Sequence, residues 1–96
     1  MAKYHLLWEV ELSRTPEDPS EKKVQWQKLQ TQVKEQMDAG VIVEWGQFAG
    51  EPRGYTIIEG SEIDLTKLTN IYAPFVSFTS RPVMSVEQVM KASEAM

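Results

Sequence analysis

The segment VIVEWGQFAGEPRGYTIIEG, residues 41–60, carries the strand and turn signals from which the topology follows. Its two ends, residues 41–48 and 55–59, are rich in β-branched and aromatic side chains, which favour strands. The six residues between these ends contain Gly50, Pro52 and Gly54, a composition typical of a loop. We therefore predict a hairpin of two antiparallel strands in the middle of the chain.

A strand and a helix precede this hairpin. Residues 4–12 alternate large apolar side chains with other residues, as in a strand with one buried face. Asp18 and Glu21 flank a proline at the first helical position, which is a helix-start pattern with an N-cap and a capping carboxylate. Apolar residues then recur every three or four positions, and Gly40 provides a C-terminal stop. We predict a helix between these two signals.

A second helix and a fourth strand follow the hairpin. Ser61 opens a short helix that must end before Pro74, because the residue before a proline avoids the helical region. Residues 75–81 form a fourth predicted strand. The segment SVEQ, residues 85–88, has the capping-box pattern and opens a last short helix. The side chains of this helix that we expect to pack inside are Val86, Val89 and Met90.

The predicted order is β-α-β-β-α-β with an extra C-terminal helix, which is the order of the split βαβ or ferredoxin-like unit. This α+β order gives a four-stranded antiparallel sheet with its helices on one face. A length of 96 residues suits one domain, so we expect residues 1–96 to form a single ferredoxin-like α+β domain. The predicted core between sheet and helices contains Leu6, Trp8, Val10, Leu29, Val33, Leu65 and Leu68.

Large apolar side chains occur at both the odd and the even positions of the predicted strands, which point to opposite faces of the sheet. Leu7 opposes Leu6, and Ile57 opposes Ile58, while Phe75 opposes other apolar residues of the fourth strand. In an antiparallel sheet with helices on one side, the open face is normally polar. Scattered surface hydrophobes account for such residues in many proteins. The stronger interpretation is that a second copy of the chain covers this face, because one short chain has no second sheet to offer. We expect a homodimer through the helix-free sheet face.

Three segments carry a resemblance to a known family: YHLLWEVEL (4–12), DAGVIVEWGQFAGEPRGYTIIEG (38–60) and YAPFVSFTSRPVMS (72–85). With the element order, they resemble the dimeric α+β-barrel superfamily, and more closely its small bacterial members of unknown function. The resemblance implies a homodimer formed sheet to sheet and a small pocket in each subunit. Members of the superfamily include cofactor-free monooxygenases, isomerases, haem enzymes and proteins with no assigned reaction. Because they share no catalytic motif, no catalytic residue carries over.

The composition disfavours several classes of function. Ten Lys and Arg against fourteen Asp and Glu argue against a nucleic-acid partner. The absence of cysteine and the single histidine argue against a metal site, and we expect no cofactor. The glycines and serines match no phosphate-cradle, dinucleotide or nucleophile motif. Glu9 and Glu11 interrupt the first apolar run, and no stretch approaches the ~20 apolar residues of a membrane helix, so we expect a cytoplasmic protein without membrane contact.

Eight side chains are candidates for a ligand-binding site. Histidine is the residue type most used for proton transfer near neutral pH, and three glutamates lie inside otherwise apolar strands, where burial would perturb them. An arginine near the end of the fourth strand can pair with one of them or hold an anion. Three aromatic residues suit the walls of a pocket for a planar ligand. These candidates are His5, Glu9, Glu44, Trp45, Tyr55, Glu59, Phe78 and Arg81.

Three functions stay open at this point. The first is binding of a small apolar molecule, or an accessory role, without catalysis. The second is a cofactor-independent enzyme, resembling a monooxygenase or isomerase, on a small organic substrate. The third is a purely structural interaction module. Any ligand site is expected between the sheet and the helices, with the aromatic candidates as walls and a glutamate or His5 as the polar contact.

Overall fold

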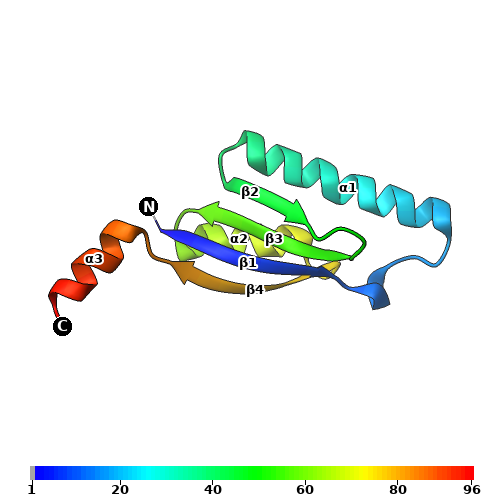
Figure 1. The fold of residues 1–96 in the computed structure, drawn as a ribbon. Coiled ribbons are helices and arrows are strands. Elements are labelled where there is room, and N and C mark those ends of the chain that lie inside the picture. Colours follow the sequence, from blue (N-terminus) through cyan, green and yellow to red (C-terminus); the bar gives the residue numbers. More distant parts are fainter. Residues whose placement is uncertain (1) are drawn as a thin grey trace.

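The computed structural model describes residues 2–96, in which two helices cover one face of a four-stranded antiparallel sheet and a third extends beyond its end (Figure 1). In chain order the elements are β1 (Lys3–Val10), a 3₁₀ turn (Leu12–Arg14), α1 (Pro19–Asp38), β2 (Ile42–Gln47), β3 (Arg53–Glu59), α2 (Glu62–Tyr72), β4 (Val76–Val83) and α3 (Val86–Glu94). The sheet order is β2-β3-β1-β4. The predicted α+β class is confirmed, and the topology is compatible with a ferredoxin-like fold carrying an extra C-terminal helix.

The helices begin where the capping signals predict. The Asp18 side chain accepts a hydrogen bond from the Glu21 backbone N–H at 3.0 Å, which caps α1. Reciprocal capping boxes open α2 at Ser61 and α3 at Ser85. Gly40 follows α1 with a φ of 80°, a conformation that glycine adopts without strain. These starts and stops depend on near neighbours in the chain, so the sequence determines them.

Three strand ends differ from the prediction by two residues, and the first is the start of β3 at Arg53 instead of residue 55. β1 ends at Val10, because the chain turns into the 3₁₀ segment, and Leu12 is 68% exposed rather than part of a strand. β4 continues to Val83, through Pro82, which lies opposite Tyr4. A proline is tolerated there because β4 is an edge strand, where a missing N–H need not break the ladder.

The core lies between the sheet and the two covering helices. Leu6, Trp8, Val10 and Leu68 are buried as predicted. Leu29, Val33 and Leu65 pack against the buried cluster but are only partly buried. In fact α1 contains no fully buried side chain, whereas α2 buries Leu68 and Tyr72. We infer that α1 is the less tightly packed of the two helices.

The helix-free side of the sheet, called the open face below, is less apolar than the sequence pattern indicates. Phe75 precedes β4 instead of pointing from it, and the open-face residues of that strand include Ser77, Thr79 and Arg81. Leu7 is the large apolar side chain of β1 on this face and is 45% exposed. The expectation of two apolar faces in all four strands is therefore wrong for β4.

Helix α3 lies away from the rest of the chain, beyond the end of β4 (Figure 1). Its side chains Val86, Val89 and Met90 are exposed in the single chain, so the prediction that they pack inside is wrong. The physical reason is that the two-residue link after Val83 places α3 beyond the end of β4, out of reach of the core. No helix within residues 2–96 has the length and apolarity that a membrane crossing requires.

Candidate functional site

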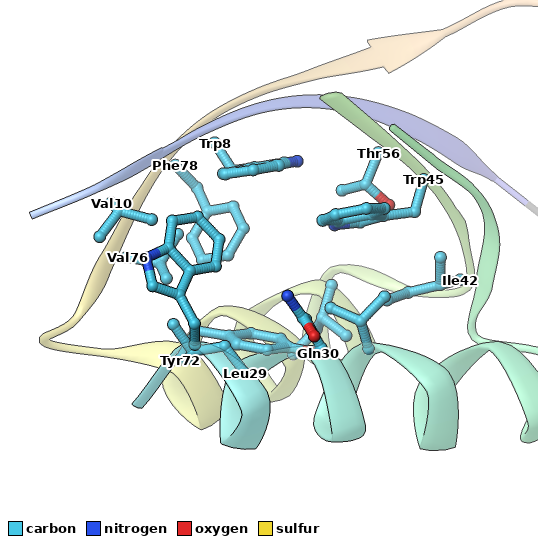
Figure 2. Close-up of a pocket in the computed structure, with 13 residues that line it drawn as sticks. Trp8, Val10, Leu29, Gln30, Ile42, Trp45, Thr56, Tyr72, Val76 and Phe78 are labelled. Atoms are coloured by element: carbon cyan, nitrogen blue, oxygen red, sulfur yellow. The ribbon is translucent and has the colours of Figure 1, made fainter. Parts of the chain in front are cut away.

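A cavity of about 40 Å³ lies between the sheet and α1 (Figure 2). Its volume exceeds the roughly 10–15 Å³ that one water molecule needs. The strands supply Trp8, Val10, Ile42, Trp45, Thr56, Val76 and Phe78, and the helices supply Trp26, Leu29, Gln30, Val33, Leu68 and Tyr72. All three tryptophans of the chain line this space. Its walls are therefore mainly aromatic and aliphatic.

Two stacked tryptophans form the wall on the sheet side. The rings of Trp8 and Trp45 lie 5.3 Å apart at an angle of 9°. The Trp8 indole Nε1 donates a hydrogen bond to the Tyr55 backbone carbonyl at 3.1 Å, which fixes the ring. Gly54 makes room for it, since a Cβ at this position would lie 2.6 Å from Trp8 Cζ2. The wall is thus preorganised by a hydrogen bond and by the absence of one side chain.

A buried phenol lies on the helix side. Tyr72 packs edge to face against Phe78, with ring centroids 5.9 Å apart, and is only 4% exposed. Its hydroxyl is buried and makes no hydrogen bond within residues 2–96. Burial, with a smaller contribution from the negative charge of Glu35, raises the pKa of Tyr72 to about 12. At neutral pH this group is therefore a protonated hydrogen-bond donor.

Two other polar side chains line the cavity. Thr56 is buried, and its hydroxyl donates to the Glu44 backbone carbonyl at 2.8 Å. Gln30 extends from α1 into the space below the Trp45 ring, as Figure 2 shows. Together with Tyr72, whose hydroxyl is buried in the wall, these groups place a small number of polar side chains around an apolar cavity. That combination is typical of small-molecule sites.

The structure divides the predicted site residues between the two faces of the sheet. Trp45 and Phe78 line the cavity. The other six point to the open face and do not line it: His5, Glu9, Glu44, Tyr55, Glu59 and Arg81. The expected placement of a glutamate or the histidine between sheet and helices is therefore corrected.

A bulge in β2 is the physical reason for part of this division. The pairing of β2 with β3 shifts between Ile42 and Glu44, so one extra residue enters the strand. Because side chains alternate between faces, the extra residue directs Glu44 to the open face and Trp45 toward the helices. The bulge follows from the pairing with β3, which is why the sequence pattern of β2 does not reveal it.

Several of the corrected residues form a cluster around Tyr55 on the open face. The Tyr55 hydroxyl donates to Glu44 Oε1 at 2.6 Å, and this hydrogen bond raises the pKa of Tyr55. The His5 ring stacks on Tyr55 with centroids 6.3 Å apart, and Phe48 stacks on it at 6.4 Å. Gly46 leaves space for the Tyr55 ring. In the single chain Glu44 and Phe48 are exposed, whereas His5 and Tyr55 are half-buried.

Two ion pairs flank that cluster. Lys3 Nζ lies 3.4 Å from Glu59 Oε1, and Arg53 Nη2 lies 3.2 Å from Glu9 Oε1. Two of the three predicted strand glutamates are therefore ion-pair partners, and the third accepts from Tyr55. Within residues 2–96 there is no group of three or more His, Cys, Asp or Glu side chains able to hold a metal ion.

Eleven of the thirteen residues that line the cavity are not among the eight candidates named from the sequence, and the aromatic and polar ones are Trp8, Trp26, Gln30, Thr56 and Tyr72. Trp8 lies on the inward-facing side of its strand, and Tyr72 follows Leu68 at helical spacing. Both inward positions are therefore visible in the sequence. The pattern does not distinguish a wall of a cavity from filling of a core, because both need an inward apolar residue.

Residues 2–96 match a protein family described as a domain of unknown function, DUF3303, and the chain belongs to that family. A comparison with curated proteins finds no match to the chain.

Proposed function

We propose that this member of the DUF3303 family binds a small, planar, largely apolar molecule in the cavity between its sheet and α1, and that it does so as a homodimer. The observation that carries the proposal is the cavity itself, whose lining is mainly aromatic and aliphatic and includes Tyr72, with its hydroxyl buried in the wall and without a hydrogen-bond partner within residues 2–96. A buried donor without an acceptor costs about 1–3 kcal/mol. A ligand with a carbonyl or ether oxygen that reaches this hydroxyl when α1 shifts outward recovers part of that cost on binding.

The walls define the chemical class of the ligand. The Trp8–Trp45 stack offers a flat apolar surface, and Phe78 offers a second one. Flat π surfaces favour flat unsaturated ligands over globular aliphatic ones. The class we propose is a small aromatic or conjugated molecule with one hydrogen-bond acceptor.

The size of the ligand depends on α1. A cavity of about 40 Å³ holds only a few water molecules or a fragment of an organic molecule. α1 has no fully buried side chain, and its residues Leu29 and Val33 are only partly buried. An outward shift of this helix therefore exposes little core and enlarges the cavity at low cost. α2, which buries Leu68 and Tyr72, is the fixed wall.

The chemistry of the lining favours binding over catalysis. No carboxylate and no imidazole lines the cavity, because His5 and the strand glutamates point to the open face. Tyr72 is the single titratable side chain of the lining, and its raised pKa makes it a poor general base near neutral pH. A monooxygenase-like or isomerase-like reaction needs a group that accepts a proton from the substrate. A purely structural module assigns no role to the apolar cavity.

Features of the open face support the homodimer. Leu7, Phe48 and Val43 are exposed apolar side chains on or beside the sheet. The charged residues Lys3 and Glu59, and likewise Arg53 and Glu9, already neutralise each other within one chain. Neutralised charges around an apolar centre lower the cost of desolvating a surface when a second copy covers it.

A pair of probes of the same shape tests the binding site. Acetophenone has a carbonyl acceptor, and ethylbenzene does not. We expect acetophenone to shift the NMR signals of the three tryptophan indole N–H groups and to bind more tightly than ethylbenzene by about 1 kcal/mol, the usual value of one hydrogen bond.

Tyr72→Phe should remove the preference for acetophenone, because it removes the donor. Tyr55→Phe is the matched control, since it deletes the same atom on the opposite face of the sheet and should leave the preference intact. An absence of indole shifts with both probes contradicts binding in this cavity. A preference that survives in Tyr72→Phe contradicts the role of the hydroxyl.

A further inference from the structure

A row of four side chains crosses the open face from one edge of the sheet to the other. The strand registers place Glu44 beside Ile57, Ile57 beside His5, and His5 beside Arg81. Because paired residues in antiparallel strands point to the same side, all four lie on the open face. Glu44 is at the β2 edge of this row and Arg81 is at the β4 edge.

The two ends of the row carry opposite charges that do not pair within one chain. Among residues 2–96, Arg81 makes no salt bridge, and the Glu44 carboxylate contacts no cationic side chain. The Tyr55 hydroxyl holds Glu44 Oε1 at 2.6 Å, which orients the carboxylate and leaves Oε2 available as an acceptor. The other charged residues of the face are the two ion pairs described above.

A two-fold axis parallel to the strands, passing between β1 and β3, makes this face complementary to itself. Such an axis places β2 of one chain over β4 of its partner, and β3 over β1 of the partner. The rotation does not change the position of a residue along the strand direction, so each row of one chain faces the same row of its partner. Glu44 then lies over Arg81 of the partner subunit, and Ile57 lies over the partner's His5.

The remaining charged residues of the face agree with this axis. Under the same rotation Lys3 faces the partner's Glu59, and Glu9 faces the partner's Arg53. Every charged residue of these rows meets the opposite charge. The alternative is an axis perpendicular to the strands, between this row and the neighbouring row of the open face that contains Thr79. It places Arg81 over the partner's Thr79 and leaves Glu44 and Arg81 without an opposite charge.

We propose that a second copy of the chain packs on the open face about this axis, and that Arg81 of each subunit forms an ion pair with the Tyr55-bound Glu44 of the other. This inference rests on the homodimer of the proposed function and specifies its geometry. The partner subunit thereby completes the cluster around Tyr55, which lacks a cation in the single chain.

The distances permit the contact. Edge strands lie 1.5 strand spacings, or about 7 Å, from the axis, so a crossing angle of roughly 30° between sheets displaces facing residues by about 4 Å. Packed sheets are separated by ~10 Å, which extended arginine and glutamate side chains span together. The pair lies at the rim of the interface, where charge complementarity sets register and orientation.

Charge reversal tests the geometry in the full-length chain. Arg81→Glu and Glu44→Arg each place two like-charged contacts in the dimer, and we expect each variant to dimerise at least roughly tenfold more weakly than the wild type. A mixture of the two variants restores both contacts in a heterodimer, as does the double variant. Sedimentation over a dilution series measures dimerisation, and native mass spectrometry resolves the heterodimer. Lys28→Glu on α1 is the control for the change in charge.

The outcomes distinguish the homodimer itself from the ion pair between Arg81 and Glu44. Weak single variants with recovery in the mixture support the ion pair, and misfolding cannot produce that recovery. A dimeric wild type with two unaffected single variants overturns this inference while the homodimer stands. Loss of dimerisation without recovery in the mixture or the double variant also overturns it. A monomeric wild type overturns both the homodimer and the ion pair, but leaves the ligand-binding test unaffected.

Discussion

Truncation of Leu68 gives a direct measure of how firmly α2 is held against the sheet. This side chain is 2% exposed and belongs to the buried cluster with Leu6, Ile58 and Tyr72. Leu68→Ala removes three carbon groups, worth about 2.4 kcal/mol at ~0.8 kcal/mol each. If the site does not collapse, roughly 75 Å³ of new cavity at ~24 cal/mol per Å³ adds about 1.8 kcal/mol. The expected loss is therefore about 2–4 kcal/mol, the lower value applying if α2 moves inward.

Urea unfolding followed by tryptophan fluorescence measures this loss at one fixed protein concentration. A chain of this length has a total stability of about 5–14 kcal/mol, so the variant should still fold but with a clearly lower midpoint. Leu12→Ala is the matched control, because the same atoms are removed from a side chain that is 68% exposed. We expect the control to change stability by less than about 0.5 kcal/mol.

A result of equal loss in Leu68→Ala and Leu12→Ala refutes the assignment of α2 as the fixed wall of the cavity. A change in the slope m, with little change in midpoint, signals instead an altered denatured state or a transition that is not two-state.

Two further predictions concern the walls of the cavity. Because burial raises the pKa of Tyr72 to about 12, the unfolded chain loses this proton first, so the stability contribution is present below pH ~10 and falls as pH rises toward the folded pKa. Tyr72→Phe should remove this part of the alkaline loss of stability, and an unchanged pH profile contradicts burial of the hydroxyl. Gly54→Ala should lower stability by about 1–3 kcal/mol in urea unfolding, since its Cβ meets Trp8 and the Gly46 carbonyl, and should shift the Trp8 indole N–H signal. A neutral Gly54→Ala would show that the tryptophan wall is not held by close packing.

Only part of the site could be predicted from the sequence. Whether a strand residue points into the cavity or to the open face depends on its odd or even position, and a bulge changes that relation. Trp45 and Phe78 were assigned to a pocket between sheet and helices, and both line the cavity. The parity of β1 also gave an inward Trp8. Glu44 required knowledge of the bulge, which exists only when β2 is paired with β3. Its contact with Tyr55, across a loop and a strand pairing, is likewise a property of the register.

The features that can be predicted from the sequence alone are those set by residues near one another in the chain. The capping residues Asp18, Ser61 and Ser85 fix three helix starts, and the turn composition of residues 49–54 fixes the hairpin. These interactions act over three or four positions, so the order of helices and strands follows from them. That order restricts the sheet to few topologies, one of which the chain adopts.

The tertiary structure is needed to show which side chains share a face, because register and packing depend on contacts between distant segments. It separated the strand carboxylates from the cavity, left the Tyr72 hydroxyl buried without an acceptor among residues 2–96, and placed α3 beyond the sheet. A shift of one residue in a strand exchanges its two faces, so a small change in pairing moves every polar group from one side of the sheet to the other. The cavity and the charged row across the open face are consequences of that register.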